Sequence, residues 1–202
     1  QILGADPRLV ADQRARLRIV HQSGEHLLRM INDVLDLAKI EAGKLELRPA
    51  PLALRDLIHD VSAAHAPAAA AKGLAFGTEV SADLPPWIEA DAHKLRQVLD
   101  NLLGNAIKFT AHGSVRLTVE PRRCGETMAT SAGVARAATE IEFAVTDTGP
   151  GISAADQQRL FQPFEQAQSA RPAAPGTGLG LAISRAIVER MGGTLAFAST
   201  PG

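Results

Sequence analysis

The sequence predicts an α+β fold in which one long helix precedes a domain of mixed helices and strands. Residues 9–46 form a helical pattern with almost no breakers, whereas 114–120 and 140–147 alternate apolar and polar residues as strands do. Turns rich in glycine and proline separate the elements beyond residue 48. With 202 residues, of which 46% are hydrophobic, the chain is long enough to bury a substantial core.

The helix expected over 9–46 carries a seam of apolar or small residues. They recur about every 3.5 residues, which is the spacing of helices that pack against partner helices. The seam residues are Leu17, Val20, Gly24, Leu27, Ile31, Val34 and Ala38. The stretch RPAP at 48–51 disfavours the helical backbone, so we expect one domain over 1–48 and a second over 49–202.

The second domain is expected to place helices on one face of a mostly antiparallel sheet. An irregular stretch at 121–138 is interpreted as a surface loop, and the Ala/Pro-rich run at 167–176 as a lid over a ligand. The expected helices are 52–72, 91–109, 153–160 and 179–191, and the expected strands are 74–80, a short one within 84–91, 114–120, 140–147 and 194–199.

Composition excludes several classes of protein. A formal net charge of −1 offers no electrostatic basis for binding nucleic acid. Because Cys124 is the only cysteine, neither a disulfide framework nor a cysteine metal site can form, and a reducing, cytoplasmic location is expected. No apolar run approaches the ~18–20 residues that cross a bilayer, so we expect no membrane contact by these residues, although a longer parent protein could be membrane-attached.

The helix expected over 91–109 has an unusual polar edge. Asn101, Asn105 and Lys108 fall in a sector about 60° wide, at about 100° per residue. A solvated surface would explain them, but amide oxygens also suit Mg²⁺, and a lysine one turn away can bind phosphates. The apolar stripe expected to face the core is Leu95, Val98, Leu99, Leu102, Ala106 and Phe109.

A second informative stretch is VTDTGPGIS at 145–153. The strand ends at Asp147, whose carboxylate can accept a hydrogen bond from an exocyclic amine such as that of adenine. Gly149 and Gly151 would let the backbone approach a flat ring. Asp-Thr-Gly is also the catalytic triplet of aspartic peptidases, but nothing after Gly151 resembles a peptidase core.

The third stretch, GTGLGLA at 176–182, is glycine-rich and precedes an apolar helix. Gly176, Gly178 and Gly180 leave backbone N–H groups that could bind phosphates. The spacing fits neither a P-loop nor a dinucleotide fingerprint, so this motif alone is weak. In LFQPFEQ at 160–166, Phe161 and Phe164 are most simply core residues.

The order NLLGNAIKFT, DTGPG, LFQPFEQ and GTGLGLA, after a helix containing INDVLDLAKIEAGKLEL, closely resembles the catalytic and ATP-binding module of sensor histidine kinases. The resemblance implies a Bergerat-type α/β sandwich with ATP and Mg²⁺ as cofactors. It also implies that Asn105 binds Mg²⁺ beside Asn101, that Lys108 contacts the phosphates, and that Asp147 binds the adenine amine. The other nucleotide-binding residues that it implies are Gly149, Gly151, Ile152, Phe161, Gly176, Thr177, Gly178, Leu179 and Gly180, with Phe161 and Phe164 at the lid hinge.

One part of the family pattern is missing. The acceptor histidine of the family lies in a His-Glu/Asp-x-x-Thr/Asn-Pro string, whereas His21 is followed by Gln22 and His26 by Leu27. We therefore expect the acceptor helix upstream of residue 1 and a closing strand beyond residue 202. The resemblance further implies a homodimer through the helical bundle and a receiver domain as partner. The alternatives are a non-catalytic ATP-binding or dimerisation module, a related kinase that acts on serine, and a clamping ATPase of the chaperone and topoisomerase kind.

Overall fold

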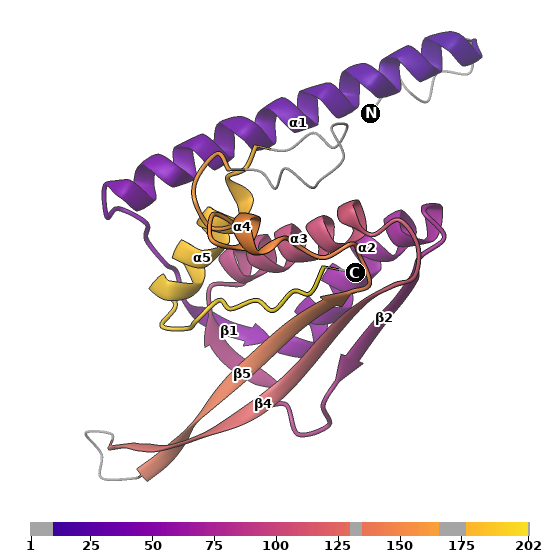
Figure 1. Ribbon diagram of the computed structural model, residues 1–202. Coiled ribbons are helices and arrows are strands. Elements are labelled where there is room, and N and C mark those ends of the chain that lie inside the picture. Colours follow the sequence, from indigo (N-terminus) through magenta and orange to yellow (C-terminus); the bar gives the residue numbers. More distant parts are fainter. Residues whose placement is uncertain (1–9, 130–134, 166–176, 202) are drawn as a thin grey trace. The chain divides into compact units, whose positions relative to one another are not determined.

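The computed structural model describes residues 10–129, 135–165 and 177–201 (Figure 1). The chain divides into two compact units, Gln1–Leu45 and Glu46–Gly202, close to the boundary expected at residue 48. Helices and strands are both present in the second unit, so the predicted α+β class is confirmed.

Helix α1, Ala11–Glu41, is the only described element of the first unit. It ends earlier than expected because Gly43 takes a left-handed conformation, with φ of 66°, and Lys44 N–H then bonds the carbonyl of Lys39. This is the glycine termination common at helix ends. No described helix is both long and apolar enough to span a bilayer. Large apolar side chains are exposed along α1 at Ile19, Val20, Leu27, Leu28, Ile31, Val34 and Leu35.

The second unit begins with a strand that sequence analysis missed. Strand β1, Ala50–Ala53, pairs antiparallel with β3, Trp87–Ala90, and helix α2, Leu54–Ala71, starts only after it. The prolines of RPAP hold this segment extended, and β3 supplies the partner that makes it a strand. The helix expected from residue 52 therefore starts two positions too early.

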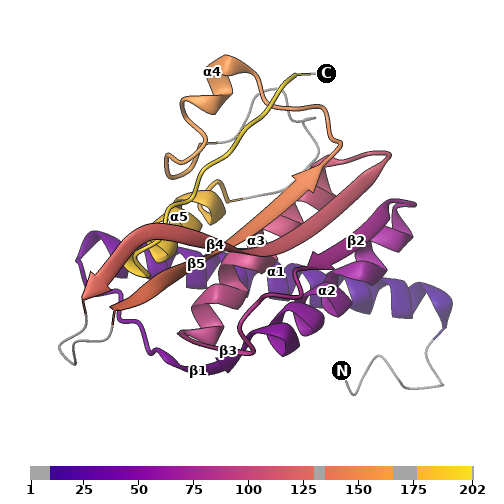
Figure 2. The same ribbon diagram turned by 90° about the horizontal axis from the view of Figure 1, so that it is seen from below.

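The main sheet has the order β2-β4-β5, with β2 at Ala75–Val80, β4 at Ser114–Ala129 and β5 at Ala135–Asp147. Strand β2 runs parallel to β4, and β4 runs antiparallel to β5. Helices α2 and α3, the latter Ala92–Phe109, cover one face of this sheet (Figures 1 and 2). Their apolar faces meet the inward side chains of β4, namely Val115, Leu117 and Val119.

Helix α3 matches the helix expected over 91–109 to within one residue, since Asp91 is its N-cap. Its buried face differs only in detail from the apolar stripe expected from the sequence. Leu103 and Ile107 are buried, whereas Leu102 is half-buried and Phe109 is 41% exposed. The helix therefore turns slightly away from the stripe expected from sequence. Its polar edge is left outside the core, as expected.

The expectation of a surface loop over 121–138 is wrong for the residues of this range that the structure describes. Strands β4 and β5 continue past the end of β2 as a two-stranded ribbon, which Figure 1 shows extending from the sheet. A register shift between Arg123 and Thr127 interrupts the pairing. Such an irregularity breaks the period-two pattern, and this is why the segment was interpreted as a loop.

The strand expected over 194–199 is also absent from the described structure. Short helix α4, Ala154–Gln157, lies near this segment, and Gln157 Nε2 donates to the carbonyl of Ser199. Ser199 Oγ accepts the N–H of Ile152 at 2.9 Å. Both bonds involve polar groups of Ser199, in the segment where a sheet partner was expected. The helix that precedes this segment along the chain is α5, Gly180–Arg190.

A charged side chain holds each end of α3: the N-cap residue Asp91 at its start and Lys72, from outside the helix, at its end. Asp91 Oδ1 accepts the N–H groups of His93 and Lys94, and its Oδ2 accepts the N–H of Arg48 at 2.9 Å. At the other end, Lys72 Nζ donates to the carbonyls of Ile107 and Lys108 at 2.6 and 2.7 Å. These contacts satisfy terminal N–H and C=O groups that have no partner within a helix.

We expect the Asp91→Ala substitution to lower the free energy of unfolding by about 1–2 kcal/mol at pH 7, because a helix cap is lost. Burial raises the pKa of the Asp91 carboxyl, but the N–H donors of Arg48, Lys94 and His93 outweigh it, so the pKa lies below its usual range. The stabilisation is thus complete above the unfolded value of about 3.9 and disappears as pH falls through the lower folded pKa.

Urea titrations at pH 7 and near pH 3 test this expectation. The difference between the variant and the unchanged chain should shrink at the acid pH. Asp83→Ala, which removes an exposed carboxylate, is the control and should change stability little at either pH. An equal loss for Asp91→Ala at both pH values would show that the cap does not act through its charge.

Candidate functional site

The polar edge of α3 forms a short chain of hydrogen bonds. Asn101 and Asn105 are half-buried, and Asn105 Nδ2 donates to Asn101 Oδ1 at 3.3 Å. Asn101 Nδ2 in turn donates to Ser184 Oγ of α5 at 2.9 Å. Within the described residues, the Oδ1 atom of Asn105 accepts no hydrogen bond, so it is the amide oxygen of this edge that can bind a cation.

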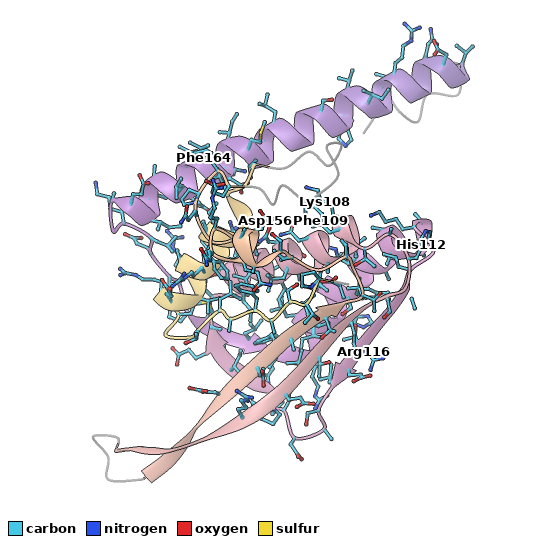
Figure 3. The ribbon with its side chains drawn as sticks, in the orientation of Figure 1. Lys108, Phe109, His112, Arg116, Asp156 and Phe164 are labelled. Carbon is cyan, nitrogen blue, oxygen red and sulfur yellow. The ribbon has the colours of Figure 1, made fainter. Side chains whose placement is uncertain are left out.

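Lys108 lies one turn from Asn105, near the C-terminal end of α3 beside Phe109 (Figure 3). Its Nζ is 4.7 Å from the centre of the Phe109 ring. Burial lowers the pKa of the Lys108 ammonium, because partial loss of water disfavours the charged form. A phosphate group beside this ammonium would favour the charged form again.

Asp147 ends β5 and is held by one of its two carboxylate oxygens. Its Oδ1 accepts the N–H of Gly149 at 2.8 Å and the hydroxyl of Thr110 at 3.4 Å. Thr110 is fully buried and directly follows α3, so it ties the position of Asp147 to the end of that helix. No described donor bonds Oδ2 of Asp147, and this oxygen can accept a bond from a ligand.

The loop after Asp147 folds tightly on its own chain. Gly151 has φ of 71°, and a Cβ atom there would lie 2.2 Å from the carbonyl oxygen of Thr200. At Gly149 a Cβ atom would lie 2.7 Å from Asp147 Oδ1. Both glycines therefore permit close backbone packing in this loop, whether or not they also approach a ligand ring. Ile152 is half-buried in the same loop.

The glycine motif before α5 is described from Thr177 onward, and Gly176 lies outside the described residues, as does the lid expected over 167–176. Gly178 has φ of 70°, and its carbonyl accepts the N–H of Phe164 at 3.0 Å. Leu179 is buried, and its N–H donates to Thr177 Oγ1. A Cβ atom at Gly180 would lie 2.2 Å from Asn101 Oδ1.

The two phenylalanines of LFQPFEQ differ in environment. Phe161 packs edge-on against Phe197, with ring centres 5.5 Å apart, and Arg185 lies over its other side at 5.3 Å. Phe164 is 66% exposed, so the expectation that it is a core residue is wrong (Figure 3). Its backbone has φ of 66° and contacts Gly178, which explains why this position is held although its ring is not buried.

The donor set fits a cation that shares its ligands with a bound phosphate. Among the described residues, no three His, Cys, Asp or Glu side chains gather to hold a metal ion. The unbonded amide oxygen of Asn105 is a hard ligand of the kind that Mg²⁺ accepts, and phosphate oxygens and water would complete the coordination. The site thus joins the amide oxygen of Asn105 and the ammonium of Lys108, both on α3, with the carboxylate of Asp147 at the end of β5. Thr110, directly after α3, bonds that carboxylate.

Comparisons with known proteins agree with this arrangement. Residues 90–202 match the family described as histidine kinase-, DNA gyrase B-, and HSP90-like ATPases, and the chain belongs to that family. The virulence sensor protein BvgS of Bordetella bronchiseptica is 44% identical over 95% of this chain, which spans 15% of that relative. The histidine-protein kinase BarA of Escherichia coli is 40% identical over 96% of this chain, which spans 20% of BarA.

A solved structure supports the same assignment. The crystal structure of full-length ShkA in complex with AMPPNP has a TM-score of 0.69 and 37% identity, and the match covers 93% of this chain and 36% of that one. The predicted resemblance to sensor histidine kinases is confirmed, and so is the prediction of an ATP-binding catalytic domain. The aspartic peptidase interpretation of Asp147 is thereby excluded.

Sequence analysis missed two polar residues that organise the site. Thr110 fixes one oxygen of Asp147, and Ser184 fixes the amide of Asn101. Thr110 could have been suspected because it directly follows Lys108 and Phe109 at the expected helix end. Ser184 gives no such signal, because a serine in an apolar helix has many ordinary roles.

We expect Gly178→Ala to destabilise the chain by at least about 1 kcal/mol more than Gly192→Ala. Both glycines have positive φ, so both substitutions carry the left-handed penalty of about 1–2 kcal/mol. At Gly178 the new Cβ would also lie 2.7 Å from the backbone of Phe164, whereas at Gly192 it meets nothing within 4 Å. Thermal or urea unfolding measures both. Equal losses would show that the approach to Phe164 does not constrain Gly178.

Proposed function

We propose that this chain binds ATP together with Mg²⁺ and transfers the γ-phosphoryl group to a histidine side chain. From the phosphohistidine the group would pass to an aspartate of a receiver domain. The main support is one observation. Asn105 Oδ1 and Asp147 Oδ2 both accept no bond from described residues, and Thr110, directly after α3, bonds Asp147 and so ties its carboxylate to the end of the helix that carries Asn105.

Each side chain of this site has a proposed task. Asp147 Oδ2 accepts the adenine amine, because it is an acceptor held rigidly through Oδ1. Lys108 binds phosphate oxygens, and Asn105 binds Mg²⁺ with Asn101 beside it. The remaining contacts to the nucleotide are assigned to Gly149, Gly151, Ile152, Phe161, Gly176, Thr177, Gly178, Leu179 and Gly180.

In phosphoryl transfer the protein contributes mainly by positioning the reactants and by stabilising negative charge on the phosphates. Mg²⁺ would neutralise charge on the phosphates. The Lys108 ammonium adds a second positive charge there, and the anchored α3 keeps it in place while the imidazole nitrogen attacks the γ-phosphorus. The bond from that phosphorus to the bridging oxygen breaks, and ADP leaves. Asn105 and Lys108 are therefore the residues of this chain proposed to act in catalysis.

The acceptor histidine and the partners are proposed from the wider family. The chain spans 15–20% of the first relatives that it matches, and neither His21 nor His26 stands in an acceptor pattern. We assign the acceptor to a helix outside these 202 residues. The exposed apolar side chains of α1 would then form the seam of a homodimeric helical bundle. A cytoplasmic location fits a domain that uses ATP and a receiver domain.

We expect Asp147→Asn to weaken ATP binding by about 1.5–3 kcal/mol, which is the range for a hydrogen bond to a charged group. Asparagine can still accept the N–H of Gly149 through its oxygen, but its amide nitrogen would then face the adenine amine as a second donor. The same amide would suit the carbonyl of guanine, so the preference for ATP over GTP should fall. Calorimetric titration with each nucleotide measures this preference.

Asp83→Asn is the matched control, because it removes an exposed carboxylate far from Asp147 in the sequence. It should leave both affinities unchanged. If Asp147→Asn also binds ATP as the unchanged chain does, Asp147 does not contact the adenine amine.

We expect the chain to bind ATP in the presence of Mg²⁺ without labelling itself. Incubation with γ-labelled ATP should leave no label on His21 or His26, because neither is followed by the acidic residue of the acceptor string: Gln22 follows His21 and Leu27 follows His26. Adding a family acceptor helix should restore acid-labile, base-stable label. Label on His21 or His26 would overturn the assignment of the acceptor, and slow ATP hydrolysis with no transfer would favour a clamping ATPase.

A further inference from the structure

Ser184 carries a buried hydroxyl to which the proposed reaction gives no task. It lies on α5, is 2% exposed, and belongs to a helix that packs against α3. Its Oγ accepts the Nδ2 of Asn101 at 2.9 Å. A buried polar group is costly unless it is bonded, so this bond holds the Asn101 amide against α5.

Gly180, one turn earlier on α5, lies against the same amide. The position of its missing Cβ lies 2.2 Å from Asn101 Oδ1, so the first turn of α5 accommodates this oxygen only because residue 180 is glycine. In this arrangement the nitrogen of the Asn101 amide faces Ser184, and its oxygen faces Gly180, where only a glycine leaves room for it.

The fixed amide then orients the next one along α3. Asn101 Oδ1 accepts Asn105 Nδ2 at 3.3 Å, so the nitrogen of Asn105 faces Asn101 and its oxygen faces away. If the Asn101 amide turned over, two NH₂ groups would face each other and the bond would be lost. Asn105 is thus linked to Ser184 through two hydrogen bonds, and loss of the Ser184 hydroxyl would release the Asn101 amide that holds Asn105 in place.

We propose that Ser184 is a positioning residue for the cation site, acting through Asn101 to aim the oxygen of Asn105 at Mg²⁺. This inference rests on the proposed function, in which Asn105 binds Mg²⁺. Ser184 itself contacts neither the cation nor the nucleotide. It links the helix that follows the glycine motif to the amide that holds the cation.

Two measurements on the 202-residue chain test this role. The first uses the ligand-free chain and follows the side-chain amide signals of Asn101 and Asn105 by NMR. Ser184→Ala should shift both signals, and Ser184→Thr, which keeps the hydroxyl, should shift them less. Ile187→Val, which removes a methyl group from a fully buried residue of α5, is the control and should leave both unchanged. Unshifted signals in Ser184→Ala would overturn the proposal.

The second measurement compares ATP binding with Mg²⁺ and with EDTA by calorimetry. Ser184→Ala should weaken binding about tenfold with Mg²⁺ and change it little with EDTA, since residues that orient a metal ligand contribute tenfold or more to metal affinity. Ser184→Thr should recover most of the loss, and Ile187→Val should show none. An equal loss with Mg²⁺ and with EDTA would mean a general structural effect and would contradict the proposal.

The failure of this proposal can be separated from the failure of the proposed function. If the unchanged chain binds ATP equally well with Mg²⁺ and with EDTA, the cation site itself is wrong. If the unchanged chain depends on Mg²⁺ and Ser184→Ala keeps that dependence in full, only the positioning role is wrong. Thermal unfolding checks that Ser184→Ala is folded. If it is not, the same two measurements use Ser184→Cys, which replaces the hydroxyl with a weak acceptor of similar shape.

Discussion

The arrangement of the second unit depends on helix α3 being held at both ends. Asp91 satisfies N–H groups at its start, and the Lys72 ammonium satisfies carbonyl groups at its end. Between these anchors, Leu99 and Leu103 are buried in the core under the sheet. Anchors at both ends and a buried face oppose sliding or rotation of the helix, so its backbone presents the outer edge in one position.

That rigidity allows one helix to organise groups from three elements. Thr110, just after α3, bonds Asp147 of β5, and Asn101 in the middle of α3 bonds Ser184 of α5. The bond to Asp147 leaves its Oδ2 without a described donor, and Asn101 in turn accepts Nδ2 of Asn105, whose Oδ1 accepts no bond from the described residues. Preorganisation of this kind reduces the entropy lost when a nucleotide binds.

Much of this could be predicted because the signals were local. The period of α3 and its polar edge both lie within one stretch of 19 residues, from 91 to 109. The errors arose where a distant partner decides the outcome. Strand β1 exists because β3 pairs with it, and in 194–199 Ser199 bonds Ile152 and Gln157 of α4 in place of a sheet partner. The bond from Asn101 to Ser184 spans 83 positions and leaves no pattern in the sequence.

The most direct test of the account is a crystal structure of the chain with a non-hydrolysable ATP analogue and Mg²⁺. The account predicts a cation at Asn105 Oδ1, phosphate oxygens at Lys108 Nζ and the adenine amine at Asp147 Oδ2. Nucleotide bound elsewhere would contradict it, for example in the surface hollow of about 270 Å³ that Leu52, Asp60 and Arg96 help to line. A cation held without Asn105 would contradict the central claim even if the nucleotide lay where it is expected.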